Sequence, residues 1–230
     1  MATRLYLNDG TNGAIDLGAQ AGTLWDQDID ASHAIWPTKE LGTVADGNAN
    51  DAHDTSNLGT GSNPCDVLYG QFISDVLPTG VNISGTVTGT IGCREGSFND
   101  NMFTQLGLYV VDSGGALVAT LLAGTSSGGG EWNSASINNR KMPRGGSTAI
   151  SSYTTGANER IVAEVGLRME STRTTGRGYM WFGSGSSGVD LLSGDGTDNS
   201  STDHPWIEFS ADIFTPPSAA GGKNQVVMFG

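Results

Sequence analysis

The sequence predicts an all-β protein, an antiparallel β-sandwich of jelly-roll type, and three observations predict it. Glycine accounts for 35 of the 230 residues, about twice its usual share, and turn-forming Ser, Thr, Asn and Asp are abundant. Several apolar runs alternate with polar residues at period two, as half-buried strands do. No strand–helix–strand rhythm occurs, which argues against a parallel α/β sheet.

The N-terminal region predicts one short strand followed by loops. Residues 3–7 (TRLYL) are the strand candidate. The stretch 8–64 carries Asn, Asp and Gly clusters with little patterning, so we expect extended loops with short strands, able to lie as an arm over the core. With no strong internal linker, residues 1–213 are expected to form a single sandwich domain.

Strand patterns are clearest from residue 65 onward. Residues 65–74 (CDVLYGQFIS) form a mixed apolar run, and residues 81–94 alternate. The apolar members of this alternation are Val81, Ile83, Val87 and Ile91. Residues 105–112 and 116–123 are expected to pair as a hairpin across the turn Asp112-Ser-Gly-Gly.

The most regular strand pattern covers residues 160–170 (RIVAEVGLRME). One face carries Ile161, Ala163, Val165, Leu167 and Met169, and the other carries Val162, Glu164, Gly166 and Arg168. A helix would scatter the first set around its cylinder, so a strand is favoured. Residues 178–183 and 205–212 complete a set of about eight predicted strands.

The C-terminal stretch 214–230 differs from the rest of the chain. Pro216 and Pro217 cannot continue a central strand, and a Ser-Ala-Ala-Gly-Gly spacer follows. The last residues then include the apolar run Val226, Val227, Met228 and Phe229. This arm is expected either to fold back onto its own core or to add a strand to the exposed edge of a neighbouring chain.

Charge and cysteine content restrict the partners. The formal net charge is −13, whereas a nucleic-acid-binding surface should be basic and an anionic membrane attracts basic segments. We therefore expect neither a nucleic-acid nor a membrane partner. The first residues lack the apolar region of a signal peptide, so Cys65 and Cys93 are expected to be reduced thiols, although spacing alone does not exclude a disulfide.

The sequence offers no catalytic motif, metal site or cofactor motif of any specificity. His33, His53 and His204 are far apart and are expected at the surface. The Asp-rich loops at 46–54 and 195–203 match a calcium-binding loop poorly, and turn chemistry explains both, although a surface Ca²⁺ stays open. The chain is therefore expected not to be an enzyme.

Loop tryptophans are the other candidate binding residues. Trp25, Trp36 and Trp132 lie in loop-rich sequence. Exposed indoles could stack on sugars or anchor a protein interface, and the alternative is that the loops fold over the core with their indoles buried. Trp25 and Trp36 are taken as candidate partner anchors, together with the arm residues 226–229.

Four blocks of sequence together resemble a group of small virion proteins of tailed bacteriophages. The blocks are residues 2–7 (ATRLYL), 65–74 with 83–91 (ISGTVTGTI), 160–168 (RIVAEVGLR) and 205–210 (PWIEFS). The resemblance spans residues 2–210 through scattered strand motifs, and the stretches 42–62 and 214–230 depart from it. It brings no catalytic residues.

The resemblance implies a structural role on the particle. Head decoration (cement) proteins of tailed phages are often β-rich trimers that clamp capsid lattice sites. The expectation is a homotrimer made in the host cytoplasm that binds the major capsid protein on the outer surface of the head. The alternative is a tail- or fibre-associated protein that binds host glycans through the loop tryptophans.

Overall fold

The structure is a computed structural model that describes residues 2–28, 37–45, 51–54, 58–59, 64–124, 128–170, 175–183, 188–196 and 202–215. Within these ranges the regular secondary structure consists of β-strands, and no helix occurs. This confirms the predicted all-β class. No helix able to cross a membrane occurs in the described residues. The arm predicted for residues 214–230 lies outside them from residue 216 onward.

The chain begins with a long strand that lies at the middle of the sheet order. The first nine strands are β1 (Thr3–Asn12), β2 (Gln27–Asp28), β3 (Lys39–Gly42), β4 (Asp51–Asp54), β5 (Leu58–Gly59), β6 (Cys65–Ser74), β7 (Asn82–Ile83), β8 (Thr86–Glu95) and β9 (Met102–Val111). Then follow β10 (Leu117–Ala123), β11 (Asn138–Met142), β12 (Thr148–Ala149), β13 (Tyr153–Thr154), β14 (Arg160–Met169), β15 (Thr175–Gly176), β16 (Gly178–Phe182) and β17 (Trp206–Phe209).

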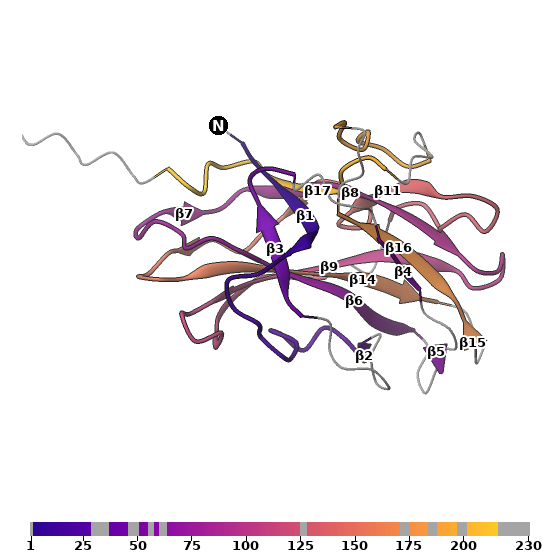
Figure 1. The fold of residues 1–230 in the computed structure, drawn as a ribbon, viewed down its shortest axis with the longest axis horizontal. Coiled ribbons are helices and arrows are strands. Elements are labelled where there is room, and N and C mark those ends of the chain that lie inside the picture. Colours follow the sequence, from indigo (N-terminus) through magenta and orange to yellow (C-terminus); the bar gives the residue numbers. More distant parts are fainter. Residues whose placement is uncertain are drawn as a thin grey trace, which may run out of the picture.

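Most strands join one large curled sheet, in the order β10-β9-β14-β6-β3-β1-β17-β8-β16-β4. Strands β11 and β12 also pair with β8, and β2 pairs with β6. Strand β3 runs parallel to β6 and antiparallel to β1, so it joins the two halves of the sheet. The result is a mixed sheet folded into a sandwich, with β6, β9 and β14 in one layer and β1, β8, β16 and β17 in the other (Figure 1).

The core lies between the two layers and is built from the faces that the alternation predicted. The apolar face predicted for β14 is fully buried in it, as are Val87 and Ile91 of the alternating run. Leu106, Leu108 and Val110 of β9 are buried there too. Facing side chains come from β1, β16 and β17, and include Leu5, Met180 and Ile207. The hairpin of β9 and β10 is also as predicted, with antiparallel pairing across the turn at Asp112.

Several elements differ from the sequence prediction. Strand β1 continues to Asn12 where a strand is predicted only for residues 3–7, and β12, β13 and β15 are short strands that the sequence does not predict. The alternating run 81–94 is not one strand, because Gly85 adopts a φ of 91° and separates β7 from β8. Strand β11 was not predicted at all, since its sequence Asn-Asn-Arg-Lys-Met has no apolar alternation. It pairs with β8, so backbone hydrogen bonds and position in the sheet, rather than an apolar pattern, make it a strand.

Candidate functional site

The outer face of the layer that contains β6, β9 and β14 is covered by the N-terminal segment, residues 13–26. Beneath this cover lies a second apolar cluster formed by Ile73, Tyr109, Val111 and Val162. Side chains of the segment pack against it, namely Ile15, Leu17 and Ala21. The expectation that part of 8–64 lies over the core is thus met by this segment, and both faces of β14 are buried.

Glu164 lies at the centre of the covered face. Its side chain is fully buried, and it accepts hydrogen bonds from the Ala21 backbone amide (2.5 Å), the Trp25 indole Nε1 (2.7 Å) and Gln71 Nε2 (2.9 Å). Burial raises the pKa of Glu164, while these three donors lower it. Two of the three donors belong to the N-terminal segment, so the carboxylate fastens the cover to β14.

Gln71 connects the N-terminal segment to the sheet at a second position. It pairs with Glu164 across the β6–β14 ladder, and its Nε2 also donates to the Ala19 carbonyl at 2.9 Å. Its Oε1 accepts from the Thr38 hydroxyl at 2.7 Å, and the Leu17 amide donates to that hydroxyl at 3.0 Å. The polar groups under the cover therefore bond mainly to the cover itself.

Asp66 on β6 holds the end of the same segment. The Asp26 backbone amide donates to the Asp66 carbonyl, and the Asp66 backbone amide donates to the Asp26 carboxylate, both at 2.9 Å. The Asp66 carboxylate accepts from Gln105 Nε2 at 2.7 Å and pairs with Arg168 at 3.0 Å. Burial raises the pKa of Asp66. These bonds hold the backbone at the end of the N-terminal segment against β6. The residues that contact Asp66 here include no nucleophile beside a general base.

The structure places the predicted binding residues as follows. Trp25 is 6% exposed and hydrogen-bonded to Glu164, and Trp132 is 2% exposed. For these two tryptophans the structure supports the alternative that loop indoles pack against the core. Trp36 and the arm residues lie outside the described part of the chain; the arm residues are Val226, Val227, Met228 and Phe229.

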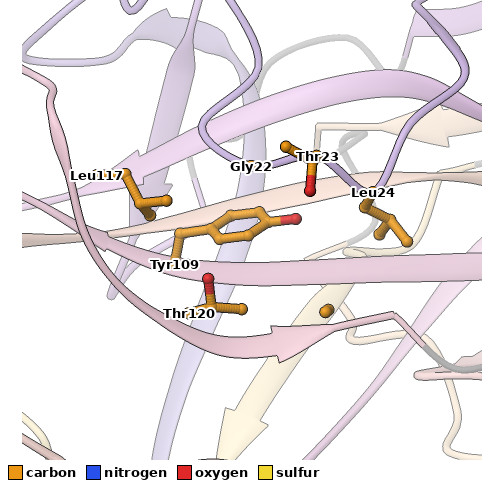
Figure 2. A pocket seen from close by; sticks show the side chains of 7 residues that line it. Gly22, Thr23, Leu24, Tyr109, Leu117 and Thr120 are labelled. Atoms are coloured by element: carbon orange, nitrogen blue, oxygen red, sulfur yellow. The ribbon is translucent and has the colours of Figure 1, made fainter.

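Beyond the cover, next to β10, the outer face is hollowed. A pocket of about 290 Å³ is lined by Gly22, Thr23, Leu24, Tyr109, Leu117, Thr120 and Ala123. Figure 2 shows the Tyr109 ring between the loop 22–24 and β10, with its hydroxyl directed toward Thr23 and Leu24. A side chain at Gly22 would overlap the Tyr109 ring, so only glycine allows the loop this close.

The Tyr109 hydroxyl forms no hydrogen bond with the described part of the chain. Tyr109 is 1% exposed. Burial raises its pKa, and so does the negative charge of Glu164. The group is therefore a neutral hydroxyl, and a buried hydroxyl without a partner gains free energy when a ligand supplies one.

Strand β10 is the end strand of the sheet on this side. Leu117 and Val118 are 49% and 42% exposed, and residues 117–123 contain no charged side chain. Among the described residues, one backbone hydrogen bond reaches this strand from outside the hairpin, from Ser151 N to the Leu121 carbonyl at 2.8 Å. An uncharged, apolar edge strand is a template for pairing with another strand, so β10 and the pocket form the candidate site.

Other groups considered from the sequence are part of the scaffold. Cys65 and Cys93 are buried thiols and not a disulfide, and burial raises the pKa of Cys93. His204 is 6% exposed and meets Tyr6 edge-on, so its predicted surface position is wrong. No group of three or more His, Cys, Asp or Glu able to hold a metal ion occurs among the described residues.

An acidic turn links β8 to β9. Glu95 is 1% exposed and accepts a bond from the Met102 amide at 3.3 Å. Burial raises its pKa to about 7, and the charges of Glu131 and Asp100 act in the same direction. Phe98 at the tip of the turn is 78% exposed. The turn thus presents one exposed apolar side chain, and it begins at a buried carboxyl that titrates near neutrality.

No family model matches the chain, and no curated protein matches it either. The candidate site therefore rests on its geometry alone.

The sequence holds only part of the signal for this site. The absence of charge in 117–123 can be read directly and marks an unprotected edge. Glu164, in contrast, looks like an ordinary outward-facing residue of an alternating strand. Its neighbours Val162 and Gly166 on the same face are the one sign that this face is covered.

Replacing Glu164 by glutamine should destabilise the protein by about 2–3 kcal/mol, because one oxygen that accepts an N–H is replaced by an NH₂ that opposes it. The matched control is Glu170→Gln, since Glu170 pairs with Arg144 at the surface, where loss of the pair costs about 0–1 kcal/mol. Urea unfolding followed by tryptophan fluorescence measures both. Equal effects of the two substitutions would show that Glu164 does not hold the cover.

Glu95 gives a pH dependence with a defined sign. Its folded pKa of about 7 exceeds its ordinary value of 4.5, so the folded state binds the proton more tightly and stability falls as the pH rises between these values. Relative to Glu95→Gln, the natural protein should lose about 1 kcal/mol between pH 5 and pH 8. Unfolding curves at both pH values measure this, and a pH-independent difference contradicts it.

Proposed function

We propose that this chain is a bacteriophage virion structural protein, a capsid decoration protein that binds and stabilises the lattice of the major capsid protein on the outer surface of the head. The observation that carries the proposal is where the phage-like blocks fall. They coincide with β1, β6, β8, β14 and β17, the strands that build both layers of the sandwich. The resemblance thus concerns the scaffold as a whole.

Two properties of the described residues support action by surface contact. The buried polar side chains Glu164, Gln71 and Asp66 are bonded to the chain's own backbone and side chains, so they serve to position the cover. The outward features are an open apolar edge at β10 and an exposed aromatic tip at Phe98. Such features fit a protein that joins other subunits.

Charge supports the same proposal. A net charge of −13 opposes non-specific aggregation of the copies, which suits a protein whose association is confined to specific surfaces. In this proposal the self-association into a homotrimer and the grip on the capsid use uncharged surface, where acidic copies can meet without repulsion. Trp36 and residues 226–229 remain the proposed anchors, whereas Trp25 anchors the chain's own cover.

The glycan-binding alternative finds less support. It needs exposed indoles in the loops, and Trp25 and Trp132 are both buried. Trp36 lies outside the described residues, so it alone of the three keeps that role open. A glycan array with the natural protein and Trp36→Ala tests this alternative directly.

Deletion of residues 218–230 should abolish binding to capsids while leaving the sandwich folded, because the described core ends before this segment. The experiment adds purified protein to heads that lack it and measures bound copies after sedimentation. Far-UV circular dichroism of the deleted protein checks the fold. Normal decoration by the deleted protein contradicts the role of the arm, and binding to tails rather than heads contradicts the capsid assignment.

A further inference from the structure

The edge of β10 is open over residues 117–120. Edge strands are normally protected by charged side chains, proline, bulges or a covering segment. Residues 117–123 carry neither charge nor proline, and the bond from the Ser151 amide to the Leu121 carbonyl covers the edge only beyond residue 120, although register shifts interrupt the pairing of β10 with β9. At the other end of the sheet order, β4 has the sequence Asp-Ala-His-Asp, so that edge carries charge. The two ends of the sheet therefore differ, and β10 is the end where another strand can pair.

The pocket beside β10 supplies a second, independent sign of a ligand. Its lining is mixed, with apolar Leu24, Leu117 and Ala123 beside the hydroxyl-bearing Thr23 and Thr120. A volume of about 290 Å³ accommodates one or two side chains. The Tyr109 hydroxyl lies buried there without a partner. A strand added along β10 would bring an apolar side chain for the cavity.

The sequence contains a segment of this chemistry. Residues 225–230 (QVVMFG) are apolar and uncharged, and Val, Met and Phe suit an added strand whose alternate side chains enter a pocket. Nine residues, 216–224, connect Thr215 to this segment, and at about 3.3 Å per residue they can span about 30 Å. This reach is about two thirds of the diameter of a domain of this size.

Position favours a neighbouring copy as the acceptor. The described chain leaves the sandwich beside β1, where the Ile213 amide donates to Thr3 Oγ1 at 3.1 Å. Strand β17, which precedes this point, is six places from β10 in the sheet order. Pro216 and Pro217 follow directly, and proline pairs favour an extended direction over a reversal of the chain.

We propose that the segment Gln225–Phe229 of one copy pairs with the free edge of β10 in a second copy and places an apolar side chain in the Tyr109 pocket. The site is then the joint between subunits. The inference rests on the proposed function in one respect, that copies of the chain act together. It can fail while decoration of capsids succeeds, because the test below contains no capsid.

The test uses two full-length variants that damage opposite halves of the joint. Thr120→Arg places a long charged side chain in the pocket at an exposed position of β10, and Val227→Asp places a charge in the segment. The matched controls are Thr43→Arg, at an exposed position after β3, and Ser218→Asp in the spacer. Sedimentation equilibrium measures the mass of each protein alone and of the two damaged variants mixed.

The natural protein and both controls should self-associate, and each damaged variant should lose at least tenfold in association constant. The equimolar mixture should recover a species of twice the monomer mass, because the intact segment of Thr120→Arg can reach the intact edge of Val227→Asp. Monomeric natural protein, damaged variants that associate normally, or a mixture that stays monomeric would each overturn the proposal. The first of these results would mean that the segment does not pair with a second copy.

Discussion

The Glu164 carboxylate is the interaction on which the arrangement of this molecule depends. A carboxylate buried on a sheet face is costly unless N–H groups surround it, and here the donors come from Ala21, Trp25 and Gln71. Two of them lie on the N-terminal segment, so the segment must lie over the sheet for the carboxylate to be satisfied. If Glu164 were exposed, water could donate the hydrogen bonds that the N-terminal segment now supplies. If Glu164 were buried without this segment, its carboxylate would lack two of its three hydrogen-bond donors.

The cover in turn defines where the sheet stays open. Residues 13–26 close the outer face over β6, β14 and part of β9, and the loop at Gly22 stops against the Tyr109 ring. Strand β10 lies past this limit, so its apolar side chains and one end of the pocket remain accessible. The placement of the N-terminal segment thus has two consequences. The middle of the segment forms the hydrogen bonds to Glu164, and its border leaves β10 accessible for the proposed contact between subunits.

The sequence predicts the strands whose apolar and polar side chains alternate. It does not predict the strands and the buried side chains that depend on tertiary contacts. The apolar face of β14 and the β9–β10 hairpin follow from period-two patterns and a turn at Asp112. Strand β11 has no such pattern because its partner β8 holds it. Trp25 looked available to a partner, and its burial depends on Glu164, which is 139 residues away in sequence. The pocket could not be predicted, because it exists only where the loop at Gly22 meets Tyr109.

The central claim is that the covered face is permanent and that β10 is the surface that partners take. Hydrogen–deuterium exchange of the protein when monomeric and when assembled tests it most directly. The account predicts that the hydrogen-bonded amides of residues 13–26 are protected in both states. It also predicts that those amides of residues 117–120 that are not paired with β9 gain protection on assembly. Unchanged exchange at 117–120, or loss of protection at 13–26 on assembly, would contradict it.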